Sequence, residues 1–241
     1  MRLFGVVGKH LGHSFSPSFF ADYFKTHKID AEYEAFEIDN IVKIENIFQR
    51  NPSGLNVTIP YKESIIPYVD ELDEIARTIQ AVNTVCFEDG KIVGRNTDAI
   101  GFKRMVQPFL TSRHERAMII GTGGASKAVQ YVLRAIGIDI IFISRTKKEG
   151  NNYFLLEDIN AQMLRSCKLI IHTTPVGMYP AIKESILMPF EVLTEDHLVI
   201  DLIYNPEQTL FLKNAKENGA QTLNGLSMLQ EQALESWRLW N

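Results

Sequence analysis

Hydrophobic and polar positions along the chain follow two periods, and each period predicts a different element. Apolar residues at every second position, or in a short continuous run, predict strands, whereas a spacing of three and four predicts helices. In the first part of the chain, strands are predicted over Leu3–Val7, Ala31–Ile38 and Asn56–Ile59, and helices over Pro17–His27 and Ile41–Arg50.

The pattern then becomes helical over Lys62–Gln80, with an interruption near Pro67. Val82–Phe87 and Lys91–Gly94 read as two strands of a hairpin, because Glu88-Asp89-Gly90 between them is a strong turn signal. A helix is predicted to follow Asp98.

A second block of pattern begins near Glu115. Short continuous apolar runs predict strands buried on both faces, as in a parallel sheet. A helix is predicted from Gly123 to Ile136, ending at Gly137, and an amphipathic helix closes the chain. The strands are predicted over Ala117–Ile120, Ile138–Ile143, Leu169–Thr173 and Leu198–Leu202. This alternation predicts an α/β fold with crossover connections.

Length and composition narrow the class of protein. The chain has 241 residues, enough for two domains, with a boundary expected within residues 98–110. A net charge of −4 gives no indication of a nucleic-acid-binding protein. The two cysteines, Cys86 and Cys167, are expected to be buried free thiols, and no metal site is expected. We expect no signal peptide and no membrane span, and hence a cytoplasmic protein.

One strand ends in an unusual way. The predicted strand Asn56–Ile59 is stopped by Pro60, which cannot donate to a ladder, and Lys62 follows directly. Lys62 is either a solubilising surface charge or a reactive group held at a strand end, and the local sequence leaves both open.

The stretch "MIIGTGGASKAV" predicts a nucleotide site. A strand leads into Gly121-x-Gly123 and then into a helix, where a tight turn lets the backbone approach a pyrophosphate at the helix N-terminus. The third fingerprint position is Ser126 rather than glycine or alanine. The next strand ends in Ser144-Arg145-Thr146 with no acidic residue, which favours NADP over NAD because arginine can bind a 2′-phosphate.

Other polar positions allow both a structural and a functional interpretation. Ser16 and Pro17 could simply start a helix as N-cap and first residue, or Ser14 and Ser16 could hold an anion there. Asn96 and Asp98 fit turn and cap positions. His13 is interpreted as structural, and His114 and His197 are expected to be solvated. Gln232 is a polar residue on a mostly apolar helix.

Taken together, these motifs resemble the shikimate dehydrogenase family along the whole chain. The matching segments, in order, are His13-Ser14-x-Ser16-Pro17, Asn56-Val57-Thr58-x-Pro60-x-Lys62, Ala81-Val82-Asn83-Thr84-Val85, Asn96-Thr97-Asp98-x-x-Gly101-Phe102, Gly121-x-Gly123-Gly124-Ala125, Ser144-Arg145-Thr146, Thr174-Pro175-x-Gly177-Met178, Asp201-x-x-Tyr204-Asn205-Pro206 and Gly225-Leu226-x-Met228-Leu229-x-x-Gln232.

The resemblance implies a fold and an activity. It implies a substrate domain over residues 1–100, completed by the last helix (226–241), and a Rossmann-like NADP-binding domain over residues 101–225. The implied reaction is the reversible NADP-dependent reduction of 3-dehydroshikimate to shikimate in aromatic amino-acid biosynthesis. The implied partner is this small-molecule substrate, without nucleic acid or membrane, in a monomer or homodimer.

The resemblance also implies roles for individual residues. Lys62 and Asp98 correspond to the catalytic pair, and we expect them to act as one coupled unit. The implied substrate ligands are Ser14 and Ser16 for a carboxylate and Asn56, Thr58, Asn83 and Gln232 for hydroxyls, with Tyr204 nearby. The implied cofactor residues are Gly121, Gly123, Gly124 and Ala125 for the pyrophosphate, Ser144, Arg145 and Thr146 for the adenosine phosphate, and Met178, Leu202 and Gly225 near the nicotinamide.

Some positions depart from the family pattern. Ser144 stands where the family usually has asparagine, which weakens the assignment of the adenosine site. The segment between Thr146 and Leu169 is too short and turn-rich for a full helix-plus-strand unit, so one crossover after the second strand is expected to be shortened. A quinate or shikimate dehydrogenase that uses NAD, and a non-catalytic nucleotide-binding sensor, are the alternative functions.

Overall fold

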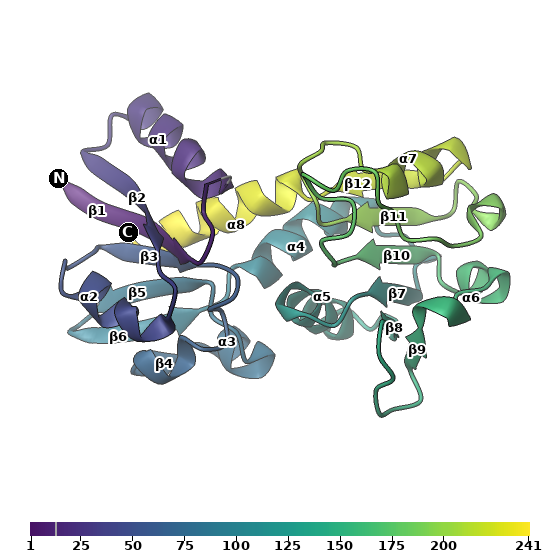
Figure 1. Ribbon diagram of the computed structural model, residues 1–241, viewed down its shortest axis with the longest axis horizontal. Coiled ribbons are helices and arrows are strands. Elements are labelled where there is room, and N and C mark those ends of the chain that lie inside the picture. The colour runs from purple at the N-terminus through teal and green to yellow at the C-terminus, as the bar shows by residue number, and fades with distance from the viewer. Residues whose placement is uncertain (13) are drawn as a thin grey trace. The chain divides into compact units, whose positions relative to one another are not determined.

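The computed structural model describes residues 1–12 and 14–241 (Figure 1). His13, interpreted above as structural, lies outside the described residues. Contacts divide the chain into two compact units. The first contains residues 1–100 and 232–241, and the second contains residues 101–231.

The first unit is built on a mixed six-stranded sheet with the order β2-β1-β3-β5-β6-β4. Its strands are β1 (Arg2–Gly8), β2 (Ala31–Glu37), β3 (Gly54–Val57), β4 (Glu71–Leu72), β5 (Thr84–Glu88) and β6 (Lys91–Arg95). Strand β3 is parallel to β1 and antiparallel to β5, which is antiparallel to β6. The carboxyl ends of β1, β3 and β6 and the amino end of β5 therefore meet at one edge of the sheet.

Helices cover both faces of this sheet. Two aromatic side chains of α1 (Phe15–His27), Phe20 and Phe24, pack with Phe4 of β1 and with Trp237 and Trp240 near the chain end. On the opposite face, the short helices α2 (Ile44–Phe48) and α3 (Glu74–Ile79) contribute to a second apolar cluster that includes side chains of β1, β2, β3 and β5. The alternating side chains of the strands thus supply two separate cores.

The predicted hairpin is confirmed. Strands β5 and β6 pair from Thr84 with Arg95 to Glu88 with Lys91, and Asp89 and Gly90 close the turn with positive φ angles of 50° and 77°. This backbone conformation explains the Asp-Gly signal, since both central residues of such a turn lie in the left-handed region.

Two local predictions are wrong. Residues 62–80 do not form a long helix. The segment folds as a turn, a 3-10 helix over Ile66–Tyr68, strand β4 and helix α3, because Glu71 and Leu72 pair with β6. The start of α1 is also displaced. Its N-cap is Ser14, whose backbone is extended, so Ser16 and Pro17 lie inside the first turn, where a missing N–H is tolerated.

The second unit contains a fully parallel six-stranded sheet. Its strands are β7 (Arg116–Ile120), β8 (Asp139–Ser144), β9 (Tyr153–Leu155), β10 (Leu169–His172), β11 (Leu198–Asp201) and β12 (Gln221–Asn224). Their order, β12-β11-β10-β7-β8-β9, is that of dinucleotide-binding folds, with the order reversing between β7 and β10. The predicted α/β class is confirmed.

Helices and short 3-10 turns connect these strands. The helices are α5 (Gly124–Ala135), α6 (Ala161–Ser166) and α7 (Leu210–Glu217), together with the parts of α4 (Asp98–Val106) and α8 (Leu226–Leu239) that belong to this unit; the 3-10 turns are Gln107–Phe109, Leu156–Asp158 and Phe190–Val192. Among the helices of the described ranges, none is both long and apolar enough to cross a bilayer.

The shortened crossover is confirmed and defined by the structure. The connection between β8 and β9, residues 145–152, contains no helix or strand and consists of turns and bends. Strand β9 still pairs with β8 in parallel, from Phe142 with Tyr153 to Ser144 with Leu155. The neighbouring crossovers keep their helices, since α5 connects β7 to β8 and α6 connects β9 to β10, whereas the connection from β10 to β11 contains only the 3-10 turn Phe190–Val192.

Candidate active site

The polar edge of the first sheet brings the predicted catalytic pair together. The Nζ atom of Lys62 lies 2.6 Å from Oδ2 of Asp98, and the side chains are 20% and 9% exposed. Lys62 follows β3, and Asp98 is the first residue of α4, shortly after β6. The carboxyl ends of these two strands lie at the same edge of the sheet, which places the two charged side chains close together. The pair is therefore largely shielded from solvent, and the lysine keeps part of its side chain exposed.

Neighbouring contacts fix the backbone on both sides of Lys62. The buried Tyr61 side chain donates its hydroxyl to the Ile38 carbonyl at 2.6 Å. The backbone N–H of Val82 donates to the Lys62 carbonyl at 2.7 Å. The abrupt strand end at Pro60 therefore turns the chain so that Lys62 is anchored next to the start of β5, and it is not a freely solvated surface charge.

Asn83 connects the acid of this pair to the last helix. Its Nδ2 donates to Oδ1 of Asp98 at 2.9 Å and to Oε1 of Gln232 at 3.1 Å, while its Oδ1 accepts from the backbone N–H of Thr97 at 2.7 Å. Asn83 is only 2% exposed. Both amide hydrogens are thus used on protein groups, so Asn83 orients Asp98 and Gln232, and its direct contact with a substrate hydroxyl stays a prediction.

The other predicted substrate ligands of the first unit lie on the same edge. Asn56 is in β3, and Thr58 follows it with its N–H donated to the Val7 carbonyl at 2.9 Å. Ser14 and Ser16 begin α1, whose N-cap Ser14 makes no side-chain capping bond. Tyr204, by contrast, belongs to the second unit, in the segment after β11, where burial raises its pKa.

Three residues without a predicted individual role join this network. Tyr33 donates its hydroxyl to Oδ1 of Asn56 at 2.7 Å, and the buried Ser236 and Thr97 hydroxyls lie 3.2 Å apart next to Asn83 and Asn56. Thr97 stands in the Asn-Thr-Asp segment, which is a usable sequence signal. Tyr33 and Ser236 give no such signal, because each reads as an ordinary strand or helix residue.

The glycine loop of the second unit has the geometry of a phosphate site. Gly121 follows β7 with φ of 115°, where a side chain would be strained and would collide with Thr173. No described heavy atom lies within 4 Å of a Cβ built at Gly123 or Gly124, so the space above them is open. Gly123 is the N-cap of α5, whose first N–H groups face this loop. A pyrophosphate fits here.

The remaining cofactor positions lie along the same sheet edge. Ser144 ends β8 with its hydroxyl accepting from the Thr146 N–H at 3.3 Å, and the exposed Arg145 forms no ion pair with any described residue. At the end of β12, Gly225 abuts the Leu202 carbonyl so closely that a side chain would not fit, and its N–H donates to the Ile203 carbonyl at 3.1 Å. Met178 is 43% exposed.

Two histidines are more buried than their sequence predicts. His114 and His197 are 7% and 0% exposed, so the expectation that they are solvated is wrong. In each case the imidazole Nδ1 accepts the backbone N–H of the threonine three residues earlier, Thr111 at 3.0 Å and Thr194 at 2.9 Å. These two Thr-x-x-His turns lead into β7 and β11, and burial lowers the pKa of both imidazoles.

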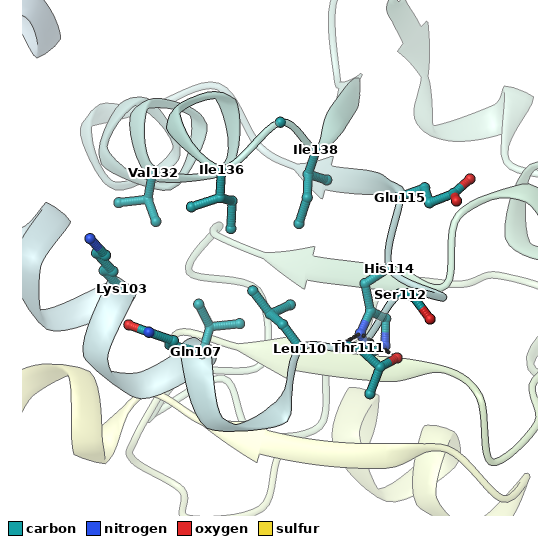
Figure 2. A pocket seen from close by; sticks show the side chains of 12 residues that line it. Lys103, Gln107, Leu110, Thr111, Ser112, His114, Glu115, Val132, Ile136 and Ile138 are labelled. Carbon is teal, nitrogen blue, oxygen red and sulfur yellow. Dashed lines mark hydrogen bonds between the residues drawn. The ribbon is translucent and has the colours of Figure 1, made fainter.

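A cavity of about 610 Å³ lies at the other end of the second unit's sheet (Figure 2). Val132 of α5 and Ile136, which follows this helix, face Leu110 across it. Glu115, on its rim, precedes β7, whereas the glycine loop follows β7, so this cavity is not the nucleotide site. Its rim carries Lys103 and Glu115, and these opposite charges favour neither an anion nor a cation.

The second unit combines a parallel sheet in the dinucleotide-binding order with an open glycine loop, and the first unit carries a lysine–aspartate pair. Together these features define a nicotinamide-dependent oxidoreductase. The chain belongs to the shikimate dehydrogenase family. Residues 6–85 match the family model described as the shikimate dehydrogenase substrate binding domain.

Similarity to known proteins covers the whole chain. Shikimate dehydrogenase (NADP(+)) from Halothermothrix orenii is 41% identical, over 99% of this chain and 90% of the relative. The structure of shikimate 5-dehydrogenase from Thermus thermophilus, solved in complex with NADP(H) and shikimate, is 31% identical with a TM-score of 0.89, over 100% of this chain and 94% of that one. Quinate dehydrogenase from Corynebacterium glutamicum, solved with NAD, is 26% identical with a TM-score of 0.88, over 100% and 93%.

Proposed function

We propose that this chain catalyses the reversible NADP-dependent reduction of 3-dehydroshikimate to shikimate, with Lys62 and Asp98 as the proton-transferring pair. The observation that carries the proposal is the 2.6 Å contact between Lys62 and Asp98, held by Asn83, in a chain 41% identical to a shikimate dehydrogenase (NADP(+)). A solubilising lysine would not be anchored beside a buried carboxylate.

The geometry of the pair supports acid–base chemistry. The Asp98 carboxylate accepts from both Lys62 and Asn83, so its two oxygens are fixed. One N–H of Lys62 is used on Asp98, and the others remain for the oxygen of a substrate carbonyl or hydroxyl. As the hydroxyl is oxidised, its proton passes to the Lys62–Asp98 pair and returns in the reverse direction.

Polar groups on the same edge suit the remaining groups of the substrate. Ser14 and Ser16 begin a helix of 13 residues, where hydroxyls and the helix dipole favour a carboxylate. Gln232 offers its Nε2, which donates to no group in the described ranges, while its Oε1 is occupied by Asn83. Asn56 and Thr58 lie at the end of β3, where they would bind ring hydroxyls.

The second unit supplies the cofactor site. When bound, the reduced cofactor NADPH would supply the hydride for reduction of the carbonyl, and the oxidised form NADP+ would accept it in the reverse reaction. Open backbone at Gly123 and Gly124 would hold the pyrophosphate, with Gly121 and Ala125 shaping the turn. Arg145, exposed and without an ion pair in the described residues, would bind the 2′-phosphate, with Ser144 and Thr146 beside it.

The same fold also occurs with quinate and NAD, as the Corynebacterium glutamicum enzyme shows for itself. The absence of an acidic residue after β8 and the presence of Arg145 favour NADP for this chain. A non-catalytic sensor is disfavoured, because such a protein has no need of a paired lysine and aspartate.

One assay tests the function. The purified protein is incubated with shikimate or quinate, each with NADP or NAD, and nicotinamide absorbance is followed. We expect the highest kcat/KM with shikimate and NADP. Absence of turnover with this combination would contradict the proposal, and faster turnover with quinate and NAD would favour the alternative enzyme.

A further inference from the structure

The side-chain amide of Asn56 is held by protein groups on both of its ends. The Tyr33 hydroxyl donates to its Oδ1 at 2.7 Å. Its Nδ2 donates to Oγ of Ser236 at 2.8 Å, with the Asn83 carbonyl and Thr84 Oγ1 each at 3.3 Å. Asn56 is only 5% exposed, so these contacts are the main environment of the amide.

These partners allow a single orientation of the amide. The two ends of an asparagine side chain have nearly the same shape, so the hydrogen-bond partners must assign them. The main-chain carbonyl of Asn83 can only accept, so the NH₂ group of Asn56 must face it. Oδ1 consequently faces Tyr33, and the Tyr33 hydroxyl must be the donor.

This orientation limits what Asn56 can offer to a ligand. Both hydrogens of its NH₂ group point to Ser236 and to the Asn83–Thr84 side. Oδ1 has two lone pairs, and Tyr33 occupies one of them. The free hydrogen-bonding capacity of Asn56 is therefore one acceptor position and no donor.

Tyr33 is itself well placed to hold this orientation. Its ring stacks on Phe20, with centroids 4.5 Å apart and planes 15° from parallel. Burial raises the pKa of Tyr33, against the opposing effect of a hydrogen bond from Ser16, so the hydroxyl keeps its proton throughout the physiological range. The Tyr33 hydroxyl therefore remains available as the donor to Asn56, one of the predicted substrate ligands.

Ser236 holds the other end of the amide. It is fully buried in α8, donates its hydroxyl to the Gln232 carbonyl at 2.9 Å and accepts from Asn56. Gln232 is another predicted ligand and lies one helical turn earlier. Strands β2 and β3 and helix α8 are therefore linked through this one amide.

We propose that Tyr33 and Ser236 are positioning residues that keep Asn56 as a hydrogen-bond acceptor for a hydroxyl of the substrate. The proposal rests on the proposed function for the identity of that substrate. It assigns the direction of the contact: the substrate hydroxyl donates to Asn56, and its oxygen remains free to accept from another group of the site.

The first test is Tyr33→Phe, which keeps the stacked ring and removes the donor. We expect KM for shikimate to rise about tenfold, the effect of one hydrogen bond at a buried group, with kcat changed less than about threefold and KM for NADP unchanged. Tyr23→Phe is the matched control, because the Tyr23 ring belongs to the same aromatic cluster and its hydroxyl has no partner in the described residues. An equal change in both KM values, or none in either, would overturn the proposal.

A double-mutant cycle tests whether the two residues act through the same amide. Ser236→Ala alone should also raise KM for shikimate about tenfold, since it leaves an Asn56 N–H without its partner. If both act through Asn56, Tyr33→Phe combined with Ser236→Ala should cost little more than the larger single effect. Multiplication of the two effects would show independent roles and would overturn the proposal.

Substrate analogues test the direction of the contact. Shikimate analogues in which one ring hydroxyl is replaced by hydrogen or by fluorine are compared as inhibitors. At the position that meets Asn56, the fluoro and deoxy analogues should bind equally poorly, because fluorine cannot donate. If the fluoro analogue at every position binds like shikimate itself, Asn56 is not an acceptor for the substrate.

A final measurement separates this proposal from the proposed function. Failure of the unsubstituted protein to turn over shikimate would contradict the function and leave the orientation of Asn56 open to a direct probe. Nuclear magnetic resonance of the Asn56 side-chain NH₂ group gives that probe. Its hydrogens should exchange with solvent at least about tenfold faster after Ser236→Ala than in the unsubstituted protein. Equal rates would overturn the orientation, whatever the activity.

Discussion

The Lys62 ammonium and the Asp98 carboxylate meet at 2.6 Å although 36 residues separate them in the chain. Lys62 reaches this point from the end of β3 and Asp98 from the end of β6, two strands that run in the same direction in one sheet. The contact therefore depends on the strand order, and its strength depends on the part-buried position of both groups.

Replacement of the lysine tests the pair directly. Lys62→Ala should lower turnover with shikimate and NADP by about 100-fold or more, the usual contribution of a positioned acid–base group. Lys91→Ala is the control, because Lys91 also pairs with a carboxylate, that of Glu71, at an exposed site. A loss of less than about tenfold for Lys62→Ala would show that this lysine does not carry the chemistry.

Alanine at Gly123 should separate cofactor binding from stability. The φ angle of Gly123 is −85° and the space around a Cβ is open, so alanine fits there, but alanine is a poorer N-cap than glycine. These two effects oppose each other, so Gly123→Ala should change the thermal midpoint only slightly. KM for NADP should rise at least about tenfold, because the methyl group would occupy space needed by a pyrophosphate.

Gly225→Ala is the contrasting variant, since its Cβ would collide with the Leu202 carbonyl and should lower the midpoint. Thermal melts and steady-state kinetics on both variants check this pair of outcomes. An unchanged KM for NADP in Gly123→Ala would argue against a pyrophosphate at this loop.

Arg145 should determine the preference of the protein for NADP over NAD. Arg145→Ala should raise KM for NADP at least about tenfold, the range for hydrogen bonds to a charged group, and leave KM for NAD nearly unchanged. Arg165→Ala, an exposed arginine in the last turn of α6, serves as the control. Parallel losses with both cofactors would mean that Arg145 does not recognise the 2′-phosphate.

The two Thr-x-x-His turns predict how stability depends on pH. Burial lowers the pKa of His114 and His197 in the folded state, whereas in the unfolded chain a histidine has a pKa of about 6.5. The unfolded chain binds more protons below that value, so this contribution to stability is complete above about pH 6.5 and decreases as the pH falls.

Each of these histidines can lower the free energy of unfolding by up to about 1.4 kcal/mol per pH unit within this window. Thermal midpoints from pH 7.5 to 5.5 should fall less steeply in His197→Gln than in the unsubstituted protein. The same slope in both proteins would exclude the buried histidine as its source.

The two free thiols should be unreactive in the folded protein. Burial raises the pKa of Cys86 to about 12 and that of Cys167 to about 11. At pH 8 the thiolate fraction is then on the order of one in a thousand or less, and the thiolate is the reactive form. Ellman's reagent should label two thiols per chain in guanidinium chloride and almost none in buffer. Rapid labelling in buffer would contradict this burial.

Periodicity predicted most of the fold because most elements are marked by local signals. The hairpin follows from Asp89-Gly90, and the parallel sheet follows from continuous apolar runs such as Ile138–Ile143. The segment 62–80 is one exception, because its apolar residues do not lie in a continuous helix and β4 forms only through pairing with β6. The secondary structure of such a segment depends on partner strands that are distant in sequence, so the local pattern cannot predict it.

The site could be predicted only in part for a similar reason. Polar residues next to strand ends, such as Asn83 and Asp98, can be recognised because they lie directly beside an apolar strand pattern. Tyr33 and Ser236 do not stand out, because their hydrogen bonds to Asn56 span 23 and 180 residues. The burial of His197 could not be predicted, because its imidazole is bound by a backbone N–H, and a backbone partner cannot be recognised from residue types.

The helix-free connection after β8 leads into the strand at one edge of the second sheet. Strand β9, at the edge of the sheet, contains only three residues, Tyr153–Leu155. An exposed strand edge can recruit another chain and start aggregation, and a very short edge strand offers too few unpaired backbone groups to do so. This edge of the second sheet therefore resists intermolecular strand pairing.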